Sequence, residues 1–302
     1  MTSATHWLPY PEWQSESISI LFAPTLHNDY TPLGEQCRQE IYMEAEEHFE
    51  RGVRRYENGD YDGAISDYTE TIQSDPNHVS AWCNRGLAWS KKGDFTKAIA
   101  DLDEAIRIEP DTASSWFLRG IVWRDKENYG KAIDDFSKAI RLDANEARFF
   151  MERGKIFEKK DEYDKAIEDF TAAIRLSPND ARIWYSRAVT WFNKGEHDKA
   201  ITDINEMIRL NPDDAGFWLL RGTVWNKKGE HERAKTDMDE AIRLDPNNAD
   251  AFALRGATWG QKGELDKALE DFERALHIDP SNQKALHNRS FALTMKEHEG
   301  EA

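Results

Sequence analysis

A repeated segment of fixed length dominates this chain and limits what it can fold into. Val79–Thr112 reads VSAWCNRGLAWSKKGDFTKAIADLDEAIRIEPDT, and Ala113–Glu146 follows directly with the same pattern. Apolar residues recur at helical spacing on both sides of the turn Lys92–Asp94, and Pro110 closes the segment. This order predicts a helix, a tight turn, a second helix and a stop. A period of about 34 residues indicates stacked helical hairpins.

The repeat occurs seven times in register. The first helix of each unit has a glycine or alanine at its centre, flanked in most units by large aromatic residues. The second helix has an alanine, and a proline ends every unit except the third, which has Ala144. The small residues should let the two helix axes approach near the low end of about 8–10 Å. The units begin at Ala45, Val79, Ala113, Ala147, Ala181, Ala215 and Ala249.

The pattern W-x3-G-x2-[WF], followed by the alanine and the proline, resembles the tetratricopeptide repeat family. The resemblance covers Ala45–Asn282 and implies an all-α solenoid, a right-handed superhelix of seven helix-turn-helix units plus a C-terminal capping helix. It also implies a non-catalytic scaffold whose first helices line a concave groove that holds peptides or helices. Such a protein would serve as an adaptor or as an assembly factor for a larger complex.

The repeat sets the expected domain boundaries. Residues 33–282 form the repeat domain with an extended first helix, residues 283–296 a capping helix, and residues 297–302 a disordered tail. We expect the apolar side chains of the capping helix to cover the last unit. These side chains are Leu286, Phe291, Ala292 and Met295.

Residues 1–32 break the repeat and form an amino-terminal arm. The arm combines Trp7 and Trp13 with Pro9 and Pro11, and then runs on into the apolar segment Ile18–Phe22. Three placements stay open: a cap over the first helix, a mobile segment, or a ligand in the protein's own groove. The third placement defines an alternative function, a regulatory subunit that is inhibited by its own arm.

An arginine and an aspartate recur in every unit on the sides of the helices expected to pack. An unpaired charge there would be costly, so we interpret the two rows as structural pairs and not as an anion-binding row. The eight arginines exceed the seven aspartates, with the surplus at the first unit. We therefore predict that each aspartate pairs with the arginine of the following unit, for example Asp135 with Arg153, and that Arg51 is left over.

The candidate binding site lies on the first helices of the third to fifth units. Cations stand there among apolar side chains, although the net charge of the chain is −17. Aromatic and arginine side chains in a concave surface are typical of binding hot spots. We expect a ligand peptide with apolar side chains and a carboxylate; the alternative is that the apolar residues pack internally and the cations are solvated. The predicted site residues are Phe117, Ile121, Arg124, Arg148, Met151, Lys155, Arg182, Tyr185, Val189 and Phe192.

Two groove chemistries of the family do not carry over to this chain. The carboxylate clamp that grips chaperone C-termini needs a set of lysines, asparagines and arginine in three consecutive units. Asn84 is present, but Phe49 precedes it and Ser114 follows it at positions of the set. An asparagine ladder of the glycosyltransferase type is likewise absent, because Asn84 is the single asparagine in its row.

Other classes of function are disfavoured. The acidic charge argues against nucleic acid and anionic membranes as partners, because both need clustered cations. No apolar run approaches the length of a membrane span, and the start of the chain lacks the features of a signal peptide. Cys37 and Cys83 make no disulfide framework. From these three observations we expect a cytoplasmic protein. The sequence has no phosphate loop, nucleophile elbow or metal cluster, so we expect no enzyme activity and no cofactor.

Overall fold

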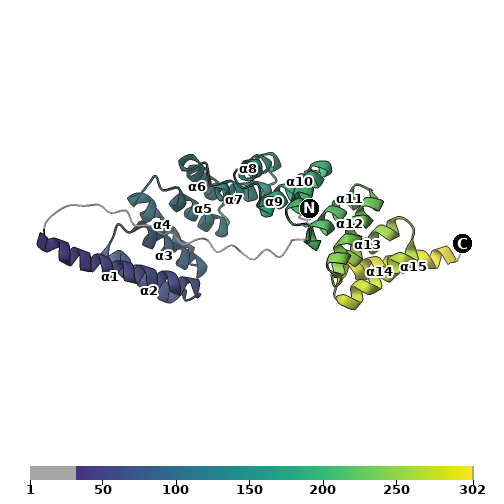
Figure 1. Cartoon of the computed structure of the whole chain (residues 1–302), viewed down its shortest axis with the longest axis horizontal. Helices are drawn as coiled ribbons and strands as arrows, with labels where there is room; N and C mark the ends of the chain where they lie inside the picture. Colours follow the sequence, from purple (N-terminus) through teal and green to yellow (C-terminus); the bar gives the residue numbers. More distant parts are fainter. Residues whose placement is uncertain (1–31, 301–302) are drawn as a thin grey trace. The chain divides into compact units, whose positions relative to one another are not determined.

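The computed structural model describes residues 32–300, and these form fifteen α-helices with no strand between them (Figure 1). The predicted arm lies outside the described residues, except Pro32, where the first helix begins. The helices are α1 (Pro32–Glu57), α2 (Tyr61–Ser74), α3 (Val79–Lys91), α4 (Phe95–Ile108), α5 (Ala113–Asp125), α6 (Tyr129–Leu142), α7 (Ala147–Lys159), α8 (Tyr163–Leu176), α9 (Ala181–Asn193), α10 (His197–Leu210), α11 (Ala215–Lys227), α12 (His231–Leu244), α13 (Ala249–Gln261), α14 (Leu265–Ile278) and α15 (Gln283–Gly300).

The helices fall into two compact units. Among the described residues, one unit holds 32–176, with α1 to α8, and the other holds 177–300, with α9 to α15. Within each unit every odd-numbered helix up to α13 packs against the even-numbered helix that follows it, and each hairpin packs against the next. This arrangement confirms the predicted all-α fold of repeated helical hairpins.

Local sequence explains where the helices begin and how the hairpins turn. The side chains of Asp60, Asp94 and Asn128 cap α2, α4 and α6 by accepting a hydrogen bond from a backbone N–H three residues on. One residue of each turn adopts a left-handed backbone, which favours glycine, as at Gly93 with a φ of 81°. In the third unit Glu127 occupies this position with a φ of 59°.

The core of each hairpin forms where a small residue faces a large one. In the third unit a Cβ added to Gly120 would lie 2.6 Å from a ring carbon of Phe136, which is itself fully buried. Beside this crossing the indole N–H of Trp116 donates to the carbonyl of Pro110 at 2.8 Å, so the aromatic ring holds the turn that precedes its helix. The same bond recurs from Trp82 to Pro76, from Trp184 to Pro178 and from Trp218 to Pro212.

The predicted arginine–aspartate pairs exist, but the partner assignment was wrong. Asp135 binds Arg119 of its own unit through two hydrogen bonds of 2.8 and 2.7 Å, and Arg153 binds Asp169. The two positions of a pair face each other across one hairpin, so the guanidinium reaches its own second helix first. The pairs are Arg51–Asp67, Arg85–Asp101, Arg119–Asp135, Arg153–Asp169, Arg187–Asp203, Arg221–Asp237 and Arg255–Asp271.

The same arginines also connect successive hairpins. The Nη1 of Arg119 donates to Asp103 of the preceding hairpin at 2.6 Å, while Nε and Nη2 bind Asp135. One guanidinium therefore joins three helices. Equivalent bonds run from Arg85 to Thr69, from Arg153 to Ser137, from Arg221 to Asn205 and from Arg255 to Asp239. The arginine without a matching aspartate is Arg289, not Arg51.

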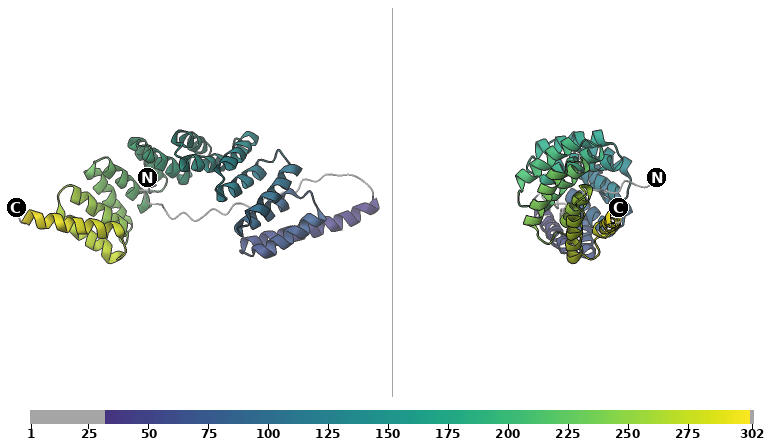
Figure 2. Two further views of the ribbon diagram at one scale, coloured as in Figure 1. Left: turned by 180° about the vertical axis from the view of Figure 1, so that it is seen from behind. Right: turned by 90° about the vertical axis from the view of Figure 1, so that its right-hand side faces the viewer.

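The closing helix differs from its prediction in two respects. It continues to Gly300, beyond the predicted end at residue 296. Ala292 is buried as expected, but Leu286, Phe291 and Met295 are exposed, so the expectation that they cover the last unit was wrong. Two alanines, Ala285 and Ala292, make the buried contacts instead, because small residues allow the helix to approach its neighbours closely. Figure 2 shows α15, in yellow, beside the last hairpin.

A double-mutant cycle tests the partner assignment. Asp135→Asn should lower the free energy of unfolding by roughly 3–5 kcal/mol, because Arg119 then loses the buried carboxylate that its Nε and Nη2 bind and keeps only Asp103. Its coupling energy with Arg119→Met should reach about 1–3 kcal/mol in urea titrations. Arg153→Met is the matched control and should show almost no coupling with Asp135→Asn. A larger coupling to Arg153 than to Arg119 would contradict the structure.

The left-handed turn residues give a second prediction. Glu127→Gly should raise the free energy of unfolding by about 0.5–1 kcal/mol, because glycine adopts a positive φ without the steric penalty of a Cβ. Gly93→Ala at the equivalent turn should lower it by about 1 kcal/mol. Thermal unfolding followed by circular dichroism measures both changes. The explanation fails if Glu127→Gly destabilises the protein or Gly93→Ala has no effect.

Candidate functional site

The ten predicted site residues divide between the two compact units. Six of them lie on α5 and α7 in residues 32–176, and four lie on α9 in residues 177–300. We therefore describe the two groups separately.

The apolar members of both groups are buried. Phe117, Ile121 and Met151 are 4–6% exposed, and Tyr185, Val189 and Phe192 are 7–9% exposed. The ring of Phe117 lies 5.6 Å from that of Phe136 and 4.8 Å from that of Phe149, measured between ring centres. These side chains pack between neighbouring helices and leave little area for a ligand. Their role in binding stays a prediction.

A first depression lies at the amino-terminal ends of α5 and α7. It has a volume of about 380 Å³ and brings Phe117 together with Arg148. The guanidinium carbon of Arg148 lies 5.9 Å from the ring centre of Phe117, and its Nε donates to Glu146 at 3.1 Å. Asp111 and Asp143 also line this depression, so its charged side chains are mostly acidic.

A second depression lies at the opposite ends of the same two helices. It has a volume of about 310 Å³ and is lined by three cations, Arg124, Lys155 and Lys159, together with Tyr129. The ammonium of Lys159 lies 5.0 Å from the ring centre of Tyr129. The carboxylates that line the depression are Asp125 and Glu127.

A buried carboxylate holds two of these cations together. Glu152, which is 7% exposed, accepts hydrogen bonds from Arg124 and, at 2.7 Å, from Lys155. Burial opposes the negative charge of Glu152, but Lys155 and Arg124 outweigh it, so the pKa of this carboxyl lies below its usual value. Glu152 therefore stays ionised and fixes the two cations at the edge of the second depression. The sequence pattern alone did not identify Glu152 as part of the candidate site.

Two further groups, Glu158 of α7 and Cys83 of α3, have shifted pKa values. Burial raises the pKa of Glu158 to about 7, although Lys155 opposes the shift. Burial also raises the pKa of the Cys83 thiol to about 12, and Ser115 lies 3.5 Å from its sulfur. A thiol that stays protonated at neutral pH is a poor nucleophile. Cys83 is therefore a small buried packing residue.

In the second unit, α9 carries Arg182 near its start. Its Nη2 donates to Asp180 at 2.7 Å, and Asp180 also caps the helix by accepting from the backbone N–H of Arg182 at 3.0 Å. The ring of Phe192 lies 5.1 Å from that of His197. Of the four predicted site residues on α9, Tyr185, Val189 and Phe192 thus belong to the core of this unit, and Arg182 is partly exposed.

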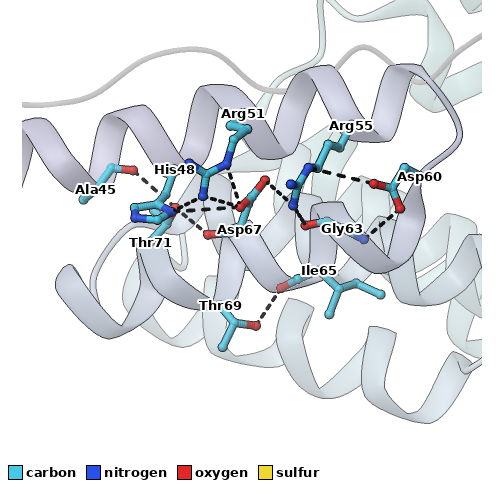
Figure 3. Close-up of polar contacts among 10 residues, drawn as sticks. All are labelled: Ala45, His48, Arg51, Arg55, Asp60, Gly63, Ile65, Asp67, Thr69 and Thr71. Carbon is cyan, nitrogen blue, oxygen red and sulfur yellow. Dashed lines mark hydrogen bonds and ion pairs between the residues drawn. The ribbon is translucent and has the colours of Figure 1, made fainter.

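The first hairpin contains a polar cluster that the sequence analysis did not predict (Figure 3). Asp67 is buried and meets Arg51 at 2.7 Å and Arg55 at 3.1 Å, while the Nη2 of Arg51 lies 2.7 Å from the Nδ1 of His48. His48 and Arg55 occupy the two positions that hold aromatic residues in the other units. This double exchange is visible in the sequence as two polar residues at aromatic positions.

The part of the chain that the structure describes shows no group of three histidine, cysteine or acidic residues placed to hold a metal ion. None of the helices between residues 32 and 300 is long and apolar enough to cross a lipid bilayer.

The raised pKa of Glu158 predicts a pH dependence. Its pKa is about 7 in the folded state, above the ordinary value of 4.5, so the folded protein binds an extra proton between these values and loses stability as the pH rises. Glu158→Gln should therefore raise the free energy of unfolding by about 1–3 kcal/mol at pH 8 and change it little at pH 4. Urea titrations at the two pH values measure this difference. An equal effect at both would show that the carboxyl titrates normally.

Comparisons with known proteins agree with the fold. Models of the tetratricopeptide repeat match residues 49–111, 90–147, 151–215, 215–248 and 249–282. A search of curated protein sequences gives no match.

Solved structures with the same fold have low sequence identity to this chain. The C-terminal part of a repeat protein from Cytophaga hutchinsonii is 17% identical, with 79% of this chain and 98% of that chain covered and a TM-score of 0.69. A tetratricopeptide repeat protein from Parabacteroides merdae is 17% identical, with coverages of 83% and 99% and a TM-score of 0.56. PilF of Pseudomonas aeruginosa is 18% identical, with coverages of 70% and 96% and a TM-score of 0.55. These likenesses concern the fold alone.

The repeat models together match most of the chain, and every matched segment lies on the helical hairpins described above. The chain therefore belongs to the tetratricopeptide repeat family.

Proposed function

We propose that this chain is a non-catalytic scaffold that binds a protein or peptide partner across α5 and α7, as an adaptor or assembly factor. Proteins of this family are protein-interaction scaffolds, which supports the general part of the proposal. The assignment of binding to α5 and α7 is supported by the two depressions at opposite ends of these helices. They differ in charge, so they can orient an extended ligand.

The second depression is the proposed site of a ligand carboxylate. Arg124, Lys155 and Lys159 supply its cations, and the first two already share Glu152. A lysine ammonium has three donors and a guanidinium has five, so both cations can bind a second carboxylate without releasing Glu152. A partly exposed pair of this kind can bind a ligand carboxylate at a small desolvation penalty.

The first depression is the proposed site of an apolar side chain of the ligand. Phe117 and Phe149 form part of its wall, and Arg148 lies above the ring of Phe117. Asp111, Asp143 and Glu146 make this end unfavourable for a second ligand carboxylate, because like charges repel. The proposed ligand therefore has its acidic group and its apolar group at opposite ends. On the other compact unit, Arg182 is proposed to take part in partner binding separately.

A library of random twelve-residue peptides, selected on the immobilised chain, tests the proposal. We expect selected peptides to share an acidic residue several positions from an apolar one. Lys159→Glu should weaken their binding fivefold or more in fluorescence anisotropy, since a charge pair of this kind contributes on the order of 1 kcal/mol. Lys165→Glu, which reverses an exposed cation on α8, is the control and should leave the affinity unchanged.

The proposal is wrong if the library yields no acidic peptides, or if Lys159→Glu and the control bind the selected peptides equally. Arg124 and Lys155 are left intact in this test because the loss of either would uncover the buried charge of Glu152. Circular dichroism of each variant establishes that a change in affinity does not come from unfolding.

A further inference from the structure

Helix α15 has the position of a first helix of an eighth hairpin. Its first residue, Gln283, stands one repeat length after Ala249, where α13 begins, and Arg289 stands one repeat length after Arg255. It packs against α14 and α13, as α13 packs against α12 and α11. In the seven preceding hairpins a second helix covers the first. Among the described residues, no helix takes that place on α15.

The face of α15 that a second helix would cover is apolar and exposed. Leu286 and Leu293 lie on this face, two helical turns apart, with exposed fractions of 43% and 39%. Phe291 and Met295 are exposed too, but they lie on the opposite side of α15. Leu286 and Leu293 stand where the preceding unit has Phe252 and Trp259, which pack in one cluster with Phe272 and Leu276 of α14. Exposed apolar side chains at positions that pack against a second helix in the preceding unit mark an interaction surface.

The guanidinium of Arg289 lacks the partner that its equivalents have. In each of the seven hairpins, Nε and Nη2 of the arginine bind an aspartate of the second helix, as Arg255 binds Asp271 at 2.9 and 2.7 Å. The Nη2 of Arg289 reaches only Glu273 of the preceding hairpin, at 3.5 Å. Its Nε is buried and makes no hydrogen bond. A buried donor without an acceptor is unfavourable, so the site is complementary to a carboxylate.

We propose that the exposed face of α15 binds an amphipathic helix of another protein, which lies against α15 as α14 lies against α13. The partner helix carries an aspartate or glutamate that accepts hydrogen bonds from Nε and Nη2 of Arg289. Its apolar residues cover Leu286 and Leu293. An alanine three residues before the acidic residue, as Ala268 precedes Asp271, allows the close approach that the other hairpins show.

This surface is distinct from the proposed ligand site on α5 and α7, and its residues are different. The interaction is of the helix-in-groove kind, with spaced apolar anchors and one buried charge pair that fixes the register. Arginine suits this position on α15 better than lysine does, because the planar guanidinium can donate two parallel hydrogen bonds to one carboxylate. The position of one carboxylate thus determines which amphipathic helices can bind α15.

The test uses the full chain and a helix-stabilised, fluorescein-labelled peptide with the sequence of α14, LDKALEDFERALHI, as the model of the partner helix. Saturable binding is expected in fluorescence anisotropy. The same peptide with Asp271→Asn should bind at least tenfold more weakly, and a scrambled peptide should not bind. In the protein, Arg289→Gln and Leu293→Asp should each weaken binding at least tenfold, and Arg289→Lys should weaken it to a lesser degree.

Arg243→Gln is the matched control, because Arg243 is an exposed arginine on α12, and it should leave the affinity unchanged. Arg289→Lys keeps the positive charge and guards against loss of folding in Arg289→Gln. The proposal is overturned if the α14 peptide does not bind, or if the Arg289 variants and the control bind it equally. It is also overturned if deletion of residues 1–31 raises the affinity, or if Leu293→Asp abolishes self-association of the chain. Those two results would assign the face to the arm or to a second copy.

Discussion

One interaction joins successive hairpins of this protein: an arginine in the first helix of most hairpins connects three helices at once. Its Nε and Nη2 hold a buried aspartate across the hairpin, and its Nη1 reaches the preceding hairpin, as Arg119 does with Asp135 and Asp103. Burial raises the pKa of Asp135, and the hydrogen bonds from Arg119 oppose that shift. Because a buried charge without its partner is strongly unfavourable, each hairpin requires its own second helix to complete the arrangement. Stability therefore depends on contacts with immediate neighbours, as expected for a repeat protein.

The two ends of the repeat array meet this requirement differently. Among the described residues no hairpin precedes the first one, and His48 and Arg55 replace two aromatic residues to surround Asp67 (Figure 3). At α15, Arg289 follows a hairpin but no second helix comes after it within residues 32–300, and its Nε has no acceptor. The charge pair is therefore complete in the first hairpin and incomplete at α15.

The sequence predicted the fold well because each hairpin is a local structure whose periodicity, glycines and prolines are visible within a single repeat. It assigned the partner of Asp135 incorrectly, because spacing alone does not show which of two neighbouring arginines faces the carboxylate. It also placed Phe117 and Met151 on an open surface, although both are buried. The depressions on α5 and α7 depend on helix ends from different repeats, and Glu152 acts there through Arg124 of the preceding repeat and Lys155 of its own. Contacts between side chains of different repeats depend on how the helices stack, and the residue pattern does not show this stacking.

The role of the arginine interaction is tested most directly by hydrogen exchange of the arginine Nε–H groups, measured by nuclear magnetic resonance on the intact chain. The seven arginines that bind aspartates across their hairpins should show slow exchange, because each Nε–H is hydrogen-bonded. Arg289 should exchange faster than these seven and become protected when a helix with a suitably placed carboxylate is added. If Arg289 is as well protected as the others in the free chain, or if all eight exchange freely, the arginine interaction does not have the role described above.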